Sequence, residues 1–190
     1  VLKINLYKLF YLIKLHILNS RGMANFLFLI IAAGLSLTFV TNAYAVDTVI
    51  NTATTSTIVL STSGDTLTVD STGQVTISSG NAVENNVNVI APFINNSGLL
   101  SGGTYLFNSG IENAGTINVL TNSSTGIIYG FYGVRNLSAG TIQTLTNSND
   151  ITGTWVGIYN SFSIGELTNS GTIGNGQAGI SNEGSITTII

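Results

Sequence analysis

A repeat of 22 to 24 residues in the second half of the chain constrains the fold more than any other feature of the sequence. An aliphatic residue followed two places later by Asn recurs as Ile111–Asn113, Val134–Asn136, Ile158–Asn160 and Ile180–Asn182. Each copy reads roughly I-x-N-x-G-T-I-x-x-L-T-N-S-G-T-I-x-G. With a degenerate earlier copy, these units fill residues 83–190, so this part of the chain is expected to be a stack of equivalent structural units.

Further aliphatic residues recur after the first Asn of each unit, and they are the candidate core. They fall at Ile117, Ile142, Ile164 and Ile186, then at Leu120, Leu145, Leu167 and Ile189, and close the unit at Ile127, Ile151 and Ile173. In the degenerate copy we align Val83, Asn85, Ile90, Phe93, Asn95 and Leu99 with these positions.

The period and the residue types together predict an all-β fold, a right-handed parallel β-helix (β-solenoid) with one unit of 22–24 residues per coil, preceded by an N-terminal signal helix. The chain holds 22 Gly, 22 Asn, 25 Thr and 20 Ser, which are poor helix formers. Each fully buried Ile or Leu is expected to contribute about 1.5–3 kcal/mol. Corner glycines with positive φ are expected at Gly115, Gly140, Gly171 and Gly184.

Asn residues at fixed positions of the repeat are expected to form side-chain amide ladders between coils. Two such columns are predicted, one of Asn113, Asn136, Asn160 and Asn182, and one of Asn122, Asn147 and Asn169.

Three segments are expected along the chain. Residues 1–45 have the pattern of a leader, with a start at Met23, an apolar run over 26–40, and Ala43 and Ala45 in position for signal-peptide cleavage after Ala45. Residues 46–82 are interpreted as an N-terminal cap and the first coils, and 83–190 as solenoid repeats truncated at the C-terminus.

The charge distribution argues against several function classes. Arg135 is the only basic residue after the leader, against eight acidic residues, which gives residues 46–190 a formal charge of −7. A surface of this kind does not attract nucleic acid. The chain has no Cys, and its only His is His16 in the leader. Residues 46–190, which we call the body, have no Lys either, so no catalytic, cofactor-binding or metal-binding residues are expected.

A few side chains still have alternatives to a structural role. Asp65 and Asp70 are two nearby carboxylates that could form the catalytic pair of a glycosidase. The simpler interpretation is that they cap turns, and Asp150 is likewise most simply a corner residue. Arg135 is either a lone exposed side chain or part of a polysaccharide-acting site. The candidate ligand-contact aromatics are Tyr129, Tyr132, Trp155 and Tyr159, with Phe131 and Phe162 nearby in sequence; core filling is the alternative.

Several motifs resemble the passenger domain of a bacterial autotransporter, the type V secretion class. They are GDTLTV and GQVTIS (64–69 and 73–78), NAGTI (113–117), LTNS (120–123 and 145–148) and LTNSGTI (167–173), all after a signal peptide. The resemblance covers nearly all of residues 24–190. It implies export to the bacterial cell surface, outer membrane or extracellular space, with an outer-membrane β-barrel translocator as a partner that is missing from this chain.

We therefore expect a secreted or surface-displayed passenger that acts as a non-enzymatic adhesin or surface scaffold, without a cofactor. Its expected ligand is a host surface protein or glycan. The alternatives are a secreted β-helix enzyme that acts on polysaccharide, and an extracellular structural or fibre protein.

Overall fold

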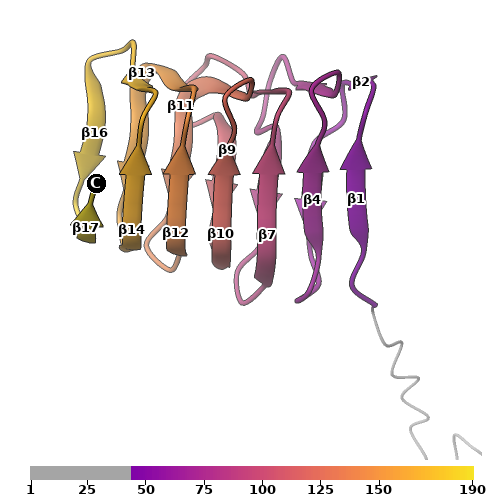
Figure 1. Ribbon diagram of the computed structural model, residues 1–190, viewed down its shortest axis with the longest axis horizontal. Coiled ribbons are helices and arrows are strands. Elements are labelled where there is room, and N and C mark those ends of the chain that lie inside the picture. Colours follow the sequence, from indigo (N-terminus) through magenta and orange to yellow (C-terminus); the bar gives the residue numbers. More distant parts are fainter. Residues whose placement is uncertain (1–43) are drawn as a thin grey trace, which may run out of the picture. The chain divides into compact units, whose positions relative to one another are not determined.

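The computed structural model describes residues 44–190, which form an all-β parallel β-solenoid of about six turns (Figure 1). The predicted all-β solenoid fold is confirmed. The predicted leader, its signal helix and Ala43 lie outside the described residues, and Ala45 is exposed at the start of them.

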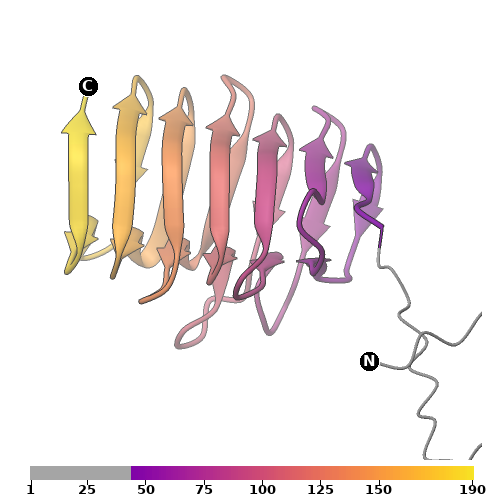
Figure 2. The same cartoon turned by 90° about the horizontal axis from the view of Figure 1, so that it is seen from below.

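One sheet runs along the whole solenoid and takes one strand from each of the six turns, with a seventh strand after the sixth turn. Its strands, in spatial order, are β1 (Asp47–Ile50), β4 (Thr66–Val69), β7 (Ile90–Asn96), β10 (Thr116–Asn122), β12 (Thr141–Asn147), β14 (Ser163–Asn169) and β17 (Ser185–Ile189). All neighbours in this sheet are parallel, and both views show them side by side in chain order (Figures 1 and 2).

The second sheet contains the other strands and forms the remaining walls of each turn. These strands are β2 (Ala53–Thr54), β3 (Ile58–Leu60), β5 (Gln74–Thr76), β6 (Val83–Asn85), β8 (Leu99–Ser101), β9 (Ser109–Asn113), β11 (Ile127–Asn136), β13 (Asp150–Asn160), β15 (Thr172–Gly174) and β16 (Ala178–Asn182). β11 pairs with both β8 and β9, and β13 with both β15 and β16, so each long strand spans two walls.

The first two turns come from residues 46–82, which the sequence assigned to a cap and first coils, and from β6, which starts the predicted repeats. β1 to β6 pair in parallel with each other and with β7, β8 and β9, so every strand of residues 47–85 belongs to the stack.

The core is a set of aliphatic columns inside the turns. Leu120, Leu145 and Leu167 lie in register on β10, β12 and β14, and all three are fully buried. Ile117, Ile142 and Ile164 form the neighbouring column, also fully buried. The predicted inward positions of these three turns are therefore correct.

In the degenerate copy Val83 and Asn85 align as predicted, but the positions predicted after Asn85 are wrong by one residue. Ile117 pairs with Ala91 and not Ile90, and Leu120 with Ile94 and not Phe93. The correct ladder residue is Asn96, in place of Asn95. Two aliphatic series one residue apart fit this segment, and since side chains alternate along a strand, the choice reverses every orientation.

A second register error concerns the closing aliphatics. Ile128, and not Ile127, pairs with Ile151, and Leu100 rather than Leu99 lies at the equivalent buried position. The turn between β10 and β11 is two residues longer than the turn between β12 and β13, so spacing from Asn122 places the wrong residue inside. Ile127 is accordingly 38% exposed, whereas Ile128 is fully buried.

The corner glycines are needed because other atoms pack closely against them, and not because the backbone has a positive φ there. Only Gly64, Gly80 and Gly174 have positive φ among the glycines of the described residues, and none of the four predicted ones does. A Cβ on Gly140 would collide with Oδ1 of Asn136 and with the backbone carbonyl of Asn113. Glycine is required there because two ladder residues pack directly against its backbone.

Two continuous ladders of Asn side chains follow the corners of the solenoid, and all are buried except the last of each ladder, Asn169 and Asn182. In each rung an amide Nδ2 donates to the Oδ1 of the Asn one turn further on, over 2.7 to 2.9 Å. One ladder runs through Asn85, Asn113, Asn136, Asn160 and Asn182, and the other through Asn96, Asn122, Asn147 and Asn169. The two columns contain all seven predicted residues, preceded by Asn85 and Asn96.

Replacement of Asn136 by Asp is expected to destabilise the fold by at least about 3 kcal/mol. The Nδ2 of Asn136 donates to Asn160 Oδ1 and to the carbonyls of Gly140 and Ser163. A carboxylate donates to none of them and places a charge against three acceptors. Chemical denaturation measures the loss. Asn86→Asp, the same change at an exposed residue, is the control; comparable losses in both variants would contradict the role of the ladder.

Replacement of Leu145 by Asp is expected to cost at least about 4 kcal/mol, because an unpaired charge enters the aliphatic column. Gln143→Asp on the same strand is the matched variant, since Gln143 is exposed, and its effect is expected within about 0.5 kcal/mol. Thermal unfolding of both variants checks the register, and equal melting temperatures would show that it is wrong.

Candidate functional site

Four aromatic side chains gather on β11 and β13, and we call them the aromatic cluster: Phe131, Tyr132, Trp155 and Tyr159. Their rings contact each other in a continuous chain. Phe131 lies 5.1 Å from Tyr132 and 5.4 Å from Trp155 between ring centroids. Tyr132 lies 5.4 Å from Trp155 and 5.4 Å from Tyr159. The cluster therefore bridges two successive turns.

Strand alternation directs part of this cluster outward. Tyr159 pairs in register with Arg135, and each stands between an inward aliphatic residue and an inward ladder Asn. Tyr132 is only 3% exposed, but it is not part of the aliphatic core and its ring contacts are with the cluster. It forms the covered base of the cluster, and Phe131, Trp155 and Tyr159 are partly exposed above it.

An irregularity in the pairing of β11 with β13 positions Trp155. Gly130 pairs with Gly153 and Tyr132 with Val156, so Phe131 alone lies opposite two residues, Thr154 and Trp155. A bulge of this kind re-aims side chains locally. It brings Trp155 beside both Phe131 and Tyr132.

Arg135 ties the cluster to its surroundings. Its Nη1 lies 3.0 Å from Oε2 of Glu112 and donates to the carbonyl of Phe107 over 3.3 Å. Its guanidinium lies 5.2 Å from the Phe107 ring centroid and 5.4 Å from that of Tyr132, within cation–π range. The only cation of the body is thus shared between one carboxylate, one carbonyl and two rings.

The loop between β8 and β9 carries exposed apolar side chains next to this site. Tyr105, Leu106 and Phe107 are 76%, 69% and 58% exposed. Phe107 has a φ of 72°, which is unusual for a residue other than glycine. Since Arg135 contacts both its ring and its carbonyl, the loop is held against the cluster at this residue.

Two polar side chains of the next turn accept hydrogen bonds from the aromatic residues of the cluster. Trp155 Nε1 donates to Gln177 Oε1 over 3.0 Å, and the Tyr159 hydroxyl donates to Glu183 Oε2 over 2.7 Å. The cluster therefore presents amide and carboxylate groups beside its partly exposed rings.

The electrostatic environment is set by carboxylates around a single cation. Burial raises the pKa of Glu112, Arg135 lowers it, and the neighbouring Glu84 raises it; the pKa lies above its ordinary value. Burial also raises the pKa of Tyr132. Arg135 lowers this pKa, and Tyr159 and Glu183 raise it. The ion pair with Glu112 offsets the charge of Arg135, although the buried Nε of Arg135 has no hydrogen-bond partner among the described residues.

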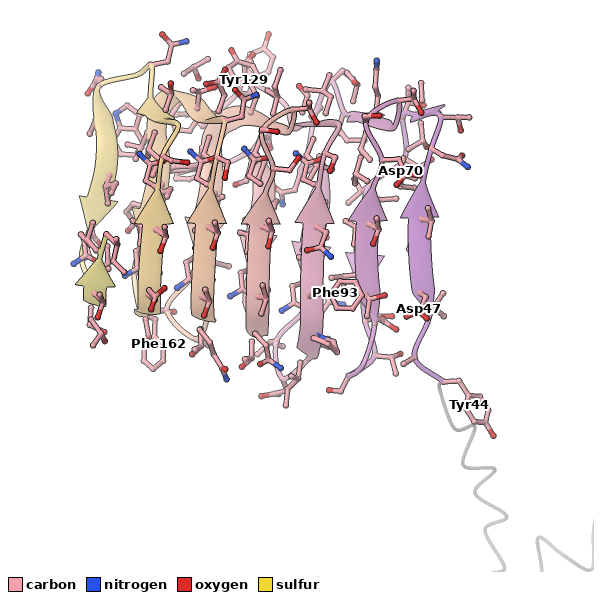
Figure 3. All side chains as sticks on the ribbon, in the orientation of Figure 1. Tyr44, Asp47, Asp70, Phe93, Tyr129 and Phe162 are labelled. Atoms are coloured by element: carbon pink, nitrogen blue, oxygen red, sulfur yellow. The ribbon has the colours of Figure 1, made fainter. Side chains whose placement is uncertain are left out.

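The predicted aromatic residues divide between different places. Tyr132, Trp155 and Tyr159 come together, joined by Phe131. Tyr129 makes no ring contact with them among the described residues. Phe162 lies at the opposite edge of the solenoid from Tyr129 and is 49% exposed (Figure 3).

Sequence reasoning missed Phe107, Glu112, Gln177 and Glu183 as members of the site. A signal for one of them was present: Glu112 occupies the middle position of the I-x-N motif, which also holds Arg135 and Tyr159. Because equivalent positions of the repeat stack, the motif itself predicts that these three side chains lie in one column.

The acidic candidates have structural surroundings. Asp65 accepts hydrogen bonds from the backbone N–H groups of Val46, Ser61 and Thr62, over 2.8 to 2.9 Å. Burial raises the pKa of Asp65, but these three bonds outweigh it, and the pKa lies below its usual value. Its carboxylate therefore caps the turn before β4.

Asp70 lies beyond the other end of β4 (Figure 3). The backbones of Asp65 and Asp70 are therefore on the order of 15 Å apart, whereas glycosidase carboxyl groups lie within about 9.5 Å of each other. The Asp150 carbonyl accepts a hydrogen bond from Asn122 Nδ2 at a corner of the stack.

Two further properties concern residues 44–190 alone. No helix in this part of the chain has the length and apolar character needed to cross a membrane. Nor do His, Cys, Asp or Glu side chains gather there in groups of three or more that could hold a metal ion.

Comparison of the chain with protein-family models, with curated proteins and with solved structures found no match. Function is therefore inferred from the residues and their geometry.

Replacement of Arg135 by Met is expected to raise the pKa of Glu112 further, because the cation that lowers it is removed. A carboxyl pKa raised by folding means that ionisation of Glu112 subtracts from stability as the pH rises through the folded-state pKa. The stability lost in Arg135→Met should therefore be greater at about pH 7 than at a pH below the ordinary carboxyl pKa.

Carboxyl-carbon NMR titration of Glu112 measures this shift directly. Arg135→Lys is the control, since it keeps the charge but not the planar group that lies against Phe107 and Tyr132. A Glu112 pKa that is unchanged in Arg135→Met would contradict the ion pair.

Proposed function

We propose that this protein is an exported, surface-displayed binding protein of the autotransporter-passenger type, non-enzymatic, in which the solenoid serves as a scaffold for the aromatic cluster. The single observation that carries the proposal is this cluster, in which partly exposed rings of two successive turns meet on an outward face beside Arg135. Aromatic and Arg side chains are enriched where proteins bind their partners.

The scaffold suits this role because its backbone is held in place by the stacked turns. The two hydrogen-bonded Asn ladders and the interior aliphatic columns stabilise the fold, so the outward side chains are free to serve binding. A rigid support preorganises a binding surface and lowers the entropy lost on binding.

Export is supported by the sequence of the leader and by the motifs that resemble autotransporter passengers. The absence of Cys from the whole chain is compatible with passage through a bacterial envelope. A non-enzymatic role is supported by the absence of His, Cys and Lys from residues 46–190 and by the Asp65 carboxylate, which caps a turn at the opposite end of β4 from Asp70.

The test is adhesion of beads that carry the full chain to a panel of cultured cells. We expect Trp155→Ala to lower adhesion at least tenfold, because Trp155 joins the two turns of the cluster. Phe162→Ala is the matched control: it also removes a partly exposed aromatic ring, but one that, within residues 44–190, makes no ring contact with the aromatic cluster. No adhesion to any cell, or equal adhesion by both variants, would overturn the proposal.

A further inference from the structure

We infer that the aromatic cluster binds a neutral, extended oligosaccharide that runs along the solenoid axis over the fourth, fifth and sixth turns. This inference deepens the proposed function and rests on it. It depends on three properties of the cluster: the direction in which its groups repeat, the pairing of its polar atoms and its charge.

The contact groups follow one another along the solenoid axis. Phe131 comes from β11, Trp155 from β13, and Gln177 directly precedes β16 of the next turn. Parallel strands repeat at about 4.8 Å, which is comparable with the length of one hexose unit in an extended chain. Successive sugar units can therefore contact equivalent positions on successive turns.

The chemistry of the surface matches a sugar on both its apolar and polar sides. A pyranose presents C–H groups that pack on aromatic rings, and hydroxyl groups that both donate and accept hydrogen bonds. Phe131 and Trp155 provide the rings. The amide of Gln177 and the carboxylate of Glu183, which accept hydrogen bonds from Trp155 and Tyr159, provide polar partners in the adjoining turn.

The charge of the site selects a neutral ligand. Arg135 is paired with Glu112, and Glu84, Glu112 and Glu183 all act on the titrating groups of this face. An anionic sugar would therefore meet carboxylates with no unpaired cation to compensate for them. A protein partner is the other candidate, but the polar atoms bonded within the cluster leave it without the dry apolar centre that protein hot spots have.

Trp155 is the only Trp in the sequence, so its fluorescence reports on this site alone. The full chain is titrated with neutral β-linked hexose and N-acetylhexosamine oligosaccharides of increasing length, and with uronate oligosaccharides of matched length. We expect a saturable change in Trp155 emission with the neutral sugars. Affinity should rise with length over the first few units and be at least tenfold weaker for the uronates.

Three variants locate the binding. Gln177→Ala alters an exposed side chain and is expected to weaken binding at least tenfold without affecting folding. Phe131→Ala is expected to abolish it, with circular dichroism as the check on the fold, and Phe162→Ala to leave it unchanged. Binding that is insensitive to both Gln177→Ala and Phe131→Ala would overturn the inference.

The same proteins on beads separate this inference from the proposed function. If no neutral oligosaccharide binds, yet beads adhere to cells through Trp155 and protease treatment of the cells removes adhesion, the ligand is a protein. The sugar inference then fails and the proposed function stands. If the beads do not adhere and no sugar binds, both fail.

Discussion

The hydrogen bond from one Asn side chain to the Asn of the next turn is the interaction on which the rest of this structure depends. Each internal Nδ2 also donates to backbone carbonyls, as Asn136 does to Gly140 and Ser163. One amide thus satisfies groups from its own turn and from the next. Because the bonding pattern is met only when the turns are in register, the ladders hold the aliphatic columns in line as well.

The ladders also explain the glycines of the repeat. Gly126 and Gly140 lie where a Cβ would meet the Oδ1 of the preceding ladder Asn and the backbone of an earlier turn. The Asn and the Gly of the repeat therefore occur together, because the Asn amide needs space at the corner and only a residue without a side chain provides it. The expectation of positive φ at these corners was wrong because it considered the backbone of one turn alone.

Much of the fold was predictable because a repeat fixes equivalent positions once its period is known. The Leu120–Leu145–Leu167 column and both Asn columns follow directly from spacing. In the degenerate copy the predicted register after Asn85 was wrong by one residue. Ile90 and Ile94 belong to two competing aliphatic series, and spacing alone does not decide between them. The loop that holds Phe107 beside Arg135 was not predictable, since it interrupts the repeat and its position depends on tertiary contacts.

The bulge opposite Phe131 left a trace in the sequence. From β11 to β13 the spacing is 23 residues between Ile128 and Ile151 but 24 between Val134 and Ile158, so one extra residue lies between these points. That residue is accommodated next to Trp155, and it distinguishes this pair of turns from the regular stack. The candidate site therefore occupies the place where the repeat departs from its own pattern, on the column of outward positions that the ladders and the core leave free to vary.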